Sequence, residues 1–368
     1  MEQARALRIL SRIMSWDDER AAQEFAWLQV MAKVKYDGYR DFLAGMPFLE
    51  SLAAWLQQFD PADRETAYSL LRKRLIYVGP AEMQRLVELF YPATMERYLI
   101  GRLAVGRAIP RFRVLSEEKF RRELDSLRRR TLIMGLSDGA RIDILRHSTV
   151  GILSNEQFVV QTQVDSFKWA DLLSDLKKAV DANATFEVIY LVDDFMGSGS
   201  SFLRWDAEKK KWTGKLTKFL TSLGENQGVV SANWKLCVHH YLASEQARDD
   251  VPKVVEKAKD DLQLASMPEI TFGMVIPRRS NIDPATDAAI VELTKRYYNP
   301  SIQTVHTDKG GEKHLGLGYA GCALPLVLDH NTPNNSLAIL WAECEARVVA
   351  GVQQPEMRPL FRRRQRHS

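Results

Sequence analysis

Two adjacent carboxylates and a loop of serine and glycine residues are the groups in this chain best suited to chemistry. Asp193 and Asp194 follow the apolar run VIYLV, and the loop that comes next contains Gly197, Ser198, Gly199, Ser200 and Ser201. The run predicts a strand buried on both faces, and open α/β sheets bind ligands at the carboxyl ends of such strands. We expect the loop (residues 197–201, the serine loop) to open a helix whose N-terminus faces an anion. The pattern predicts a sugar-phosphate site, in which the acids bind ribose hydroxyls or a metal ion.

A second loop follows an earlier predicted strand. The apolar segment of residues 131–135 leads into a tight turn that ends at Arg141, before the helical pattern IDILRH. We call residues 136–141 the Arg141 loop, and its candidate binding residues are Ser137, Asp138, Gly139 and Arg141. A guanidinium at a helix start can hold a phosphate through two hydrogen bonds. An ordinary strand-to-helix turn capped by Asp138 explains the same residues, and both interpretations remain open.

Strands alternate with helices from about residue 130 to residue 300. Helical periodicity covers residues 167–182, 213–224, 245–264 and 284–298, and strand patterns occur within residues 150–164, 234–243 and 269–276. This alternation predicts an α/β domain with a mostly parallel sheet flanked by helices. Right-handed crossovers bring the strand ends at Leu136, Asp193 and Pro277 to one edge, so that the two loops form one pocket. Because side chains alternate along a strand, His239 and His240 lie on opposite faces, and we expect structural roles for both.

The first hundred residues look entirely helical and hold no catalytic cluster. Pro61 and Pro80 stand where proline favours the first turn of a helix. We expect a docking or oligomerisation region here, which binds a protein partner or a second copy of the chain. Residues 36–41 fit a solvated helix end or a partner surface. Residues 107–130 predict an amphipathic connecting helix whose arginines at 128–130 complement its C-terminal end, with a nucleic-acid patch as the alternative.

The C-terminal part contains two polar segments, and two roles remain open for each of them. The loop DHNTPNN, residues 329–335, lies between apolar runs and suits either a turn or a substrate-binding loop. Five arginines between Arg358 and Arg366 fit a mobile solvated tail, or a contact with an acidic partner or nucleic acid. We divide the chain into a helical region of residues 1–108, an α/β domain of residues 109–345 and a basic tail of residues 346–368.

Composition limits the class of protein. The formal net charge is +4, from 51 lysines and arginines against 47 acids, which is too small to indicate nucleic-acid binding by itself. Three widely spaced cysteines form neither a zinc pattern nor a disulfide framework, which favours a reducing compartment. The N-terminus lacks the order of a signal peptide, and no apolar run has membrane-spanning length. We expect a cytoplasmic protein that does not bind membranes.

Two better-known motifs, the P-loop and the nucleophile elbow, do not match the sequence in and after residues 186–204. A P-loop ATPase requires GxxxxGK[ST], but the only Gly-Lys pair, Gly214-Lys215, lacks both the earlier glycine and the hydroxyl residue. A hydrolase nucleophile elbow requires G-x-S-x-G, and the serine loop is out of register with it.

The segment VIYLVDDFMGSGSS resembles the signature of type I phosphoribosyltransferases, in which an apolar strand, two acids and two apolar residues precede a small hydroxyl-rich loop. The resemblance implies that Asp193 and Asp194 hold the ribose hydroxyls of phosphoribosyl diphosphate and that Mg²⁺ is the cofactor. It also implies that the serine loop binds the 5-phosphate. The Arg141 loop matches the pyrophosphate-binding loop of that family.

A second resemblance concerns the rest of the chain. The helical N-terminal region and the TPNNS segment near the C-terminus are similar to a divergent group of phosphoribosyltransferase-like proteins from bacterial conflict systems, including some retron operons. This implies a toxic effector in antiviral defence, with nucleic acid, or a nucleoprotein such as a retron, as a candidate partner.

Gly197 departs from the family pattern, because many base-salvaging members have an acid at this position. A positioned general acid or base contributes roughly 10²–10⁴-fold in rate, so its absence weighs against ordinary purine salvage. We expect an enzyme acting at the anomeric carbon of phosphoribosyl diphosphate or a nucleotide, either a transferase or a glycosidase. The alternatives are a non-catalytic nucleotide-sensing or partner-binding module and a structural adaptor. Glu156 and His330 are candidates for a general base, without a spacing argument for either.

Overall fold

Residues 3–42, 47–308, 310–311, 314–349 and 351–363 are described by the computed structural model, and their packing defines two units. Unit 1 combines residues 1–83 with residues 277–368, and unit 2 is the continuous stretch of residues 84–276. The domain boundaries predicted after residues 108 and 345 do not coincide with these units.

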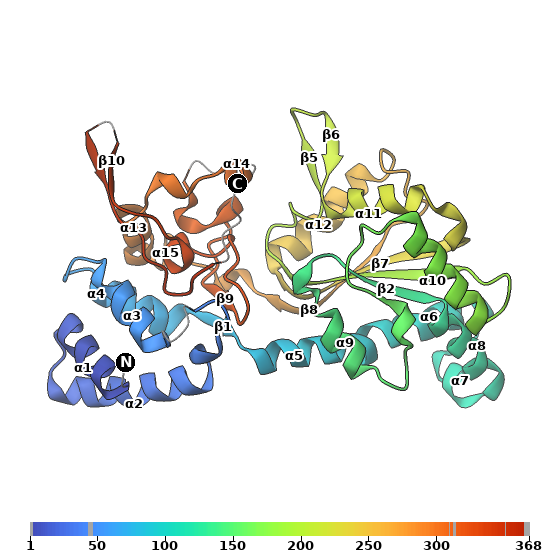
Figure 1. Ribbon diagram of the computed structural model, residues 1–368, viewed down its shortest axis with the longest axis horizontal. Coiled ribbons are helices and arrows are strands. Elements are labelled where there is room, and N and C mark those ends of the chain that lie inside the picture. Colours follow the sequence, from blue (N-terminus) through green and yellow to red (C-terminus); the bar gives the residue numbers. More distant parts are fainter. Residues whose placement is uncertain (1–2, 43–46, 309, 312–313, 350, 364–368) are drawn as a thin grey trace. The chain divides into compact units, whose positions relative to one another are not determined.

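Unit 2 is built on five strands that are all parallel, in the order β3-β2-β4-β7-β8 (Figure 1). The strands are β2 (Thr131–Gly135), β3 (Phe158–Val159), β4 (Phe186–Met196), β7 (Val230–Ser244) and β8 (Glu269–Ile276). The predicted α/β fold with a parallel sheet flanked by helices is confirmed. The central strand β4 contains the VIYLV run, whose side chains are all buried, as expected for a strand covered on both faces.

Separate layers cover the two faces of this sheet. Helices α10 (Ser166–Ala179), α11 (Lys215–Gly224) and α12 (Glu245–Ala258) share one apolar core with Ile189 and its neighbours on that face. On the other face, the ring of Phe90 lies 5.2 Å from that of Tyr190 and 4.9 Å from that of His239. Consecutive residues of β4 therefore face different layers, which matters for Asp193 and Asp194 at its carboxyl end.

The strand order places a topological switch point between β2 and β4. From β2 the chain passes through α9 (Ile142–Ser148) to β3 on one side, whereas β4 pairs with the other side of β2 and the chain then continues to β7. The loops after β2 and β4 thus leave the same edge of the sheet in opposite directions. Open α/β sheets bind ligands in the crevice that such loops form.

The helices before the sheet follow the prediction in part. They are α5 (Pro80–Leu89), a π-helical turn (Phe90–Met95), α6 (Glu96–Arg107), α7 (Arg111–Ser116) and α8 (Glu118–Arg129). The segment expected to hold one connecting helix contains two, because Glu117 between them is extended.

Two further segments of unit 2 differ from the predictions. Residues 150–164 contain only the two-residue strand β3 after a 3-10 turn (Asn155–Gln157), rather than strands around a polar turn. The serine loop does not open a helix. A hairpin of β5 (Arg204–Asp206) and β6 (Lys211–Thr213) follows it, and α11 begins only at Lys215. The hairpin replaces the expected helix because Trp205 and Trp212 form a cross-strand aromatic pair.

Unit 1 joins the N-terminal helices to the C-terminal segment around one core. Its remaining helices and strands are α1 (Gln3–Met14), α2 (Asp18–Val34), α3 (Phe48–Gln57), α4 (Arg64–Ser69), β1 (Ile76–Val78), α13 (Ala288–Arg296), α14 (Val305–Asp308), β9 (Leu326–Leu328), α15 (Ala338–Trp341), β10 (Arg347–Val349) and β11 (Val352–Gln354). Strand β1 pairs in parallel with β9, so the expectation of an entirely helical N-terminal region is wrong at this point. The sequence pattern did not indicate this strand because its partner, β9, lies far away in the sequence.

The polar segments of unit 1 are more buried than predicted. Tyr36 and Tyr39 are each 3 % exposed and pack around Phe361, whereas Asp37, Gly38 and Arg40 are exposed, so residues 36–41 are solvated only in part. Phe361 is itself fully buried, which corrects the expectation of a mobile tail, although Arg364 and Arg366 lie outside the described residues. In the loop of residues 329–335, Thr332 donates to the carbonyl of Phe361, which favours its interpretation as a turn.

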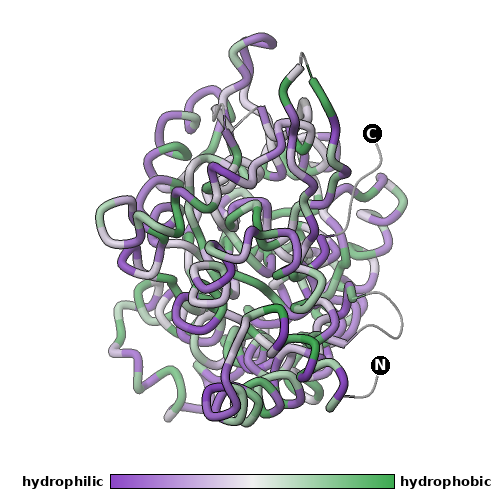
Figure 2. The backbone as a smooth tube through the Cα atoms, turned by 90° about the vertical axis from the view of Figure 1, so that its left-hand side faces the viewer, coloured by the Kyte–Doolittle hydropathy of each residue, from purple (hydrophilic) through white to green (hydrophobic). Residues whose placement is uncertain are grey.

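No helix among the described residues is long and apolar enough to cross a membrane. Along the backbone, hydrophobic and hydrophilic stretches alternate at short intervals (Figure 2).

Candidate functional site

Asp193 lies near the carboxyl end of β4 and is only 1 % exposed. Its carboxylate accepts hydrogen bonds from the hydroxyl of Ser137, in the Arg141 loop, and from the ammonium of Lys215, at the first position of α11. Burial raises the pKa of the Asp193 carboxyl above its usual range, and the Lys215 charge opposes this effect. Asp193 therefore connects the Arg141 loop to the start of α11.

Asp194 follows Asp193 on β4 and is partly exposed. One carboxylate oxygen accepts a hydrogen bond from the backbone N–H of Phe195 at 2.7 Å. The carboxylate also lies directly over Gly139, where a Cβ atom would come within 2.4 Å of Asp194 Oδ2. Only glycine allows the Arg141 loop to approach this carboxylate so closely. Asp194 is thus the more exposed of the two acids, whereas Asp193 is buried.

The serine loop is a compact turn that two neighbouring elements hold in place. Gly199 adopts a positive φ of 79°, and a Cβ there would lie 2.2 Å from a methyl group of Val251 in α12. Ser244, the last residue of β7, donates its hydroxyl to the carbonyl of Gly197 at 2.5 Å and also caps the N-terminus of α12. Within the loop, the hydroxyls of Ser198 and Ser200 lie 3.0 Å apart. The loop backbone is therefore fixed, while the hydroxyls of Ser198, Ser200 and Ser201 are partly or fully exposed.

A hydrogen bond from β7 holds the Arg141 loop in place. The hydroxyl of Tyr241 donates to the carbonyl of Ala140 at 2.9 Å, and burial raises the pKa of Tyr241 well above its ordinary value, so it remains a donor. Arg141 lies directly before α9, as predicted for a residue at a helix start. Its backbone is left-handed, with φ of 53°, and the residue is 7 % exposed. Ser137, rather than the expected Asp138, caps the turn, and Asp138 is exposed.

Lys215, Tyr241 and Ser244 are the site residues that the sequence did not indicate. Lys215 belongs to the Gly-Lys pair that fails the P-loop pattern, and its role appears only when α11 packs against β4. His240 is the register partner of Asp193, and burial lowers its pKa to about 3, so it is neutral there. His239 faces the opposite layer, as predicted, with Nδ1 2.9 Å from the hydroxyl of Thr271.

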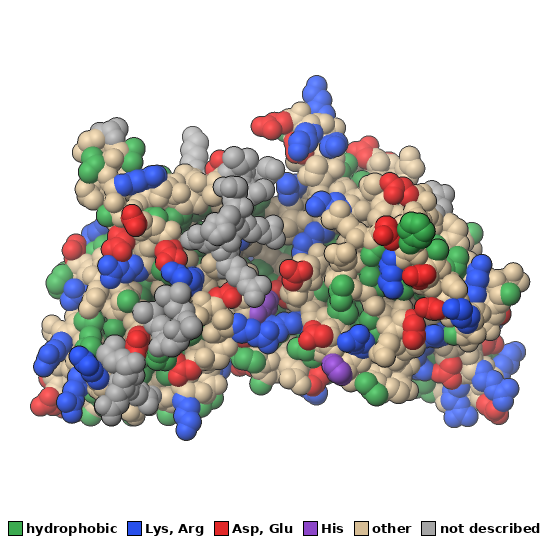
Figure 3. Space-filling view, in the orientation of Figure 1, with side chains coloured by type: hydrophobic (Ala, Val, Ile, Leu, Met, Phe, Trp, Pro, Cys, Tyr) green, Lys and Arg blue, Asp and Glu red, His purple; other side chains and the backbone are tan. Residues whose placement is uncertain are grey.

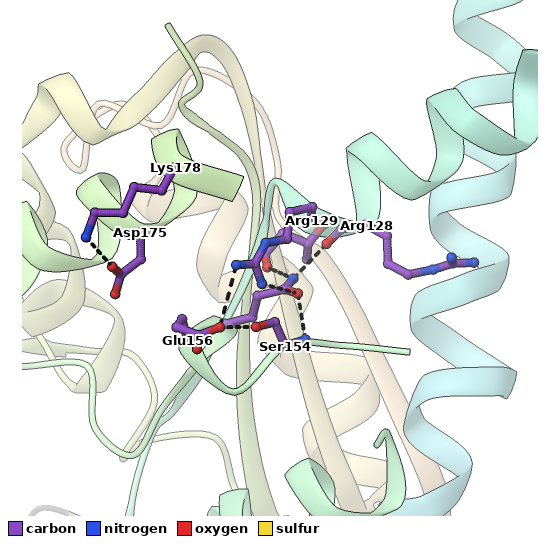
Figure 4. A network of polar contacts seen from close by, with 8 residues as sticks. Arg128, Arg129, Ser154, Glu156, Asp175 and Lys178 are labelled. Atoms are coloured by element: carbon purple, nitrogen blue, oxygen red, sulfur yellow. Dashed lines mark hydrogen bonds and ion pairs between the residues drawn. The ribbon is translucent and has the colours of Figure 1, made fainter. Parts of the chain in front are cut away.

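Of the two candidate general bases, Glu156 is not placed at this edge of the sheet. Glu156 precedes β3 at the amino-terminal edge, where Arg129 and Ser154 contact its carboxylate (Figure 4). His330 belongs to unit 1, with Nδ1 3.0 Å from the Asp329 carboxylate.

A cavity of about 730 Å³ also opens at the amino-terminal edge, beside Arg128 and Arg129. Arg128 pairs there with Glu96 and Asp125, and Arg129 pairs with Glu156. Because acids already neutralise both guanidinium groups, we place no anion site in this cavity.

The pH dependence of stability tests the environment of Asp193. A carboxyl whose pKa is raised in the native state binds its proton more tightly there than in the unfolded chain, where the pKa is near 3.8. Between these two pKa values the native state holds more protons, so this group makes stability fall as the pH rises. Asparagine does not titrate. The free energy of unfolding of the wild type minus that of Asp193→Asn should therefore decrease from about pH 3 to about pH 7. Urea unfolding of both proteins at several pH values measures this difference in free energy. A difference that grows with pH would contradict a raised pKa for Asp193.

A parallel α/β sheet with an acid pair and two small-residue loops at its switch point defines a class of proteins that bind nucleotides and sugar phosphates. A family model, PRTase-CE (phosphoribosyltransferase, conflict-systems-associated), matches residues 52–363. The chain belongs to this family, as the motif of residues 188–201 together with the helical N-terminal region and the TPNNS segment predicts. The match extends over both units and so includes the C-terminal segment of unit 1. Neither the curated proteins nor the solved structures include a match to this chain.

Proposed function

We propose that this chain is a phosphoribosyltransferase-like enzyme that acts at the anomeric carbon of phosphoribosyl diphosphate or of a nucleotide. The observation that carries the proposal is the position of Asp194, between the Arg141 loop and the serine loop at the switch point between β2 and β4. Family membership supports the same class of ligand.

Each element of the site has a role in this proposal. Asp194 accepts hydrogen bonds from the ribose hydroxyls, because it is the acid that remains partly exposed. The backbone amides and hydroxyls of the serine loop bind the 5-phosphate. The Arg141 loop, with its guanidinium and its N–H groups, binds the pyrophosphate of the substrate. Asp193 does not reach the ribose while Lys215 pairs with it, so its part is to hold Lys215 and Ser137 in place.

The reaction breaks the bond between the anomeric carbon and the leaving group, which is attached through oxygen in phosphoribosyl diphosphate and through a base nitrogen in a nucleotide. In transfer, a nitrogen of an acceptor base forms the new bond and pyrophosphate leaves with the bonding electrons. In hydrolysis, water forms the new bond, loses a proton and yields ribose 5-phosphate. Positive charge develops on the ribose in an oxocarbenium-like transition state, and the nearby Asp194 carboxylate stabilises it electrostatically.

Mg²⁺ is part of the proposal. Magnesium in enzymes is commonly held by one or two carboxylates together with substrate phosphates, rather than by a cage of protein ligands. Asp194, which is partly exposed, fits such a site, and Asp193 can join it only if Lys215 moves. When bound, the ion neutralises charge on the leaving pyrophosphate.

The ion pair between Lys215 and Asp193 favours a second candidate function. A site in which one signature acid is engaged by a lysine, and in which Gly197 replaces an acid, is suited to binding a phosphoribosyl ligand without turnover. Such a protein would be a nucleotide sensor with the phosphoribosyltransferase fold.

Calorimetric titration with phosphoribosyl diphosphate and Mg²⁺, combined with a pyrophosphate-release assay, separates these functions. The enzyme is expected to bind the ligand and to release pyrophosphate with at least one acceptor base or with water. Binding without release across all bases and nucleotides would leave only the sensor. Binding that is unchanged in the Asp193→Asn/Asp194→Asn variant would contradict both functions, because both place the ligand at these acids.

The family description also supports a biological role as an effector in a conflict system. In that role, expression of the chain together with its genomic neighbours is expected to protect cells from phage. Protection that persists in the Asp193→Asn/Asp194→Asn variant would instead assign the chain an adaptor role.

A further inference from the structure

A basic, tryptophan-bearing hairpin leaves unit 2 directly after the serine loop. The strands β5 and β6 project beyond the helices that cover the sheet (Figure 1), and Lys and Arg side chains gather on the projecting part (Figure 3). Residues 204–213 contain four cations and two acids, in a chain whose formal net charge is only +4. The site proposed above does not use this hairpin, which lies between the serine loop and α11.

Contacts at its base hold the hairpin against the serine loop. The guanidinium of Arg204 donates to the carbonyl of Ser200 at 3.0 Å, and the backbone N–H of Lys215 donates to the carbonyl of Ser201 at 3.0 Å. Gly214, with φ of 141°, lets the returning strand pass so close that a Cβ there would lie 2.3 Å from the carbonyl oxygen of Phe202. The hairpin therefore has a defined position relative to the candidate phosphate loop.

The two faces of the hairpin carry different chemistry. Trp205 and Trp212 are cross-strand partners on one face, with ring centroids 5.4 Å apart in an edge-to-face arrangement. Trp212 is anchored, since its indole N–H donates to Asp261 at 2.8 Å, whereas Trp205 is 49 % exposed. Lys210 in the turn and Lys211 in β6 are exposed, and neither forms a close ion pair among the described residues, although Lys211 is the cross-strand register partner of Asp206. The hairpin thus offers an anchored aromatic pair and two exposed cations.

We propose that this hairpin (residues 204–213, the β5–β6 arm) binds single-stranded nucleic acid. A base stacks on the exposed indole of Trp205, because every base has a π-face, and backbone phosphates bind at Lys210 and Lys211. An acidic peptide would match the lysines but would leave the exposed tryptophan without a specific partner. Binding at the arm does not depend on turnover at the phosphoribosyl site, so the two proposals fail separately.

Fluorescence anisotropy of the full chain with labelled 20-nucleotide oligo(dT) and oligo(U), over a range of salt concentrations, tests the proposal. We expect binding that weakens with salt. Trp205→Ala should weaken it about tenfold, as loss of one stacked base does, and Trp205→Phe should restore most of the affinity. Lys210→Ala/Lys211→Ala should lower the slope of log affinity against log salt by about 1.4, since a single strand contributes about 0.7 for each phosphate contact.

Lys119→Ala/Arg121→Ala is the matched control. It removes two exposed cations of α8 that likewise form no close ion pair among the described residues, and it should leave binding within about twofold of the wild type. The proposal is overturned if the oligonucleotides do not bind, if the control variant lowers affinity as much as the arm variant, or if poly-glutamate competes equally well. Asp194→Asn should keep full oligonucleotide affinity, which distinguishes failure of the arm from failure of the phosphoribosyl site.

Discussion

Asp194→Asn is expected to lower pyrophosphate release from phosphoribosyl diphosphate by about 10²–10⁴-fold. The substitution keeps the size of the side chain but removes the charge from two hydrogen bonds to ribose hydroxyls. Each hydrogen bond to a charged group contributes about 1.5–3 kcal/mol, so the loss is about 3–6 kcal/mol. Because each 1.36 kcal/mol changes a rate tenfold, this range corresponds to the expected decrease. Steady-state kinetics of pyrophosphate release gives the measurement.

The control for this variant is Asp175→Asn on α10, which removes a half-exposed carboxylate whose ion pair among the described residues is with Lys178. It should retain the wild-type rate, and both variants should unfold within a few degrees of the wild type. A rate for Asp194→Asn within tenfold of the wild type would place the ribose elsewhere and would remove the main support for the proposed function.

Gly214→Ala is expected to destabilise unit 2 by about 3 kcal/mol or more. The backbone of Gly214, with φ of 141° and ψ of −172°, lies in a region that is essentially restricted to glycine, where other residues cost about 1–3 kcal/mol. The added Cβ would also meet the carbonyl oxygen of Phe202 at 2.3 Å and its carbon at 2.7 Å. These are backbone atoms that cannot rotate away, so the hairpin, Lys215 and the serine loop must all shift. Urea unfolding measures the loss.

Gly224→Ala, at the other end of α11, is the matched control. A Cβ at Gly224 would meet no atom within 4 Å, and its backbone is helical, so alanine should be neutral or should stabilise the chain by up to about 1 kcal/mol. Equal stability of the two alanine variants would show that the close approach at Gly214 is not maintained in solution.

The class of fold and the center of the site were predictable because their signals are local. The VIYLV run predicts a buried strand from five consecutive residues, and the acids and small residues after it form a contiguous motif. The Arg141 loop was predictable for the same reason, since Arg141 stands directly before α9.

That Asp193 is buried in an ion pair while Asp194 stays partly exposed could not be predicted from two adjacent acids. Because side chains alternate along β4, Asp193 and Asp194 face opposite sides of the sheet. Which of them pairs with a lysine depends on how α11 packs. Lys215 comes well after Asp193 in the sequence, in a pair of residues that fails the motif tested there. The same holds for Tyr241 and Ser244, which reach the loops only because β7 pairs with β4.

By itself, the sequence determined the parallel α/β architecture, the acid pair and the two loops, because periodicity and short motifs act over a few residues. Only the tertiary structure decided that Asp193 is buried under Lys215, that a hairpin rather than a helix follows the serine loop, and that β1 pairs with β9. Each of these features depends on a contact between residues far apart in the chain, whose formation is governed by the packing of whole elements.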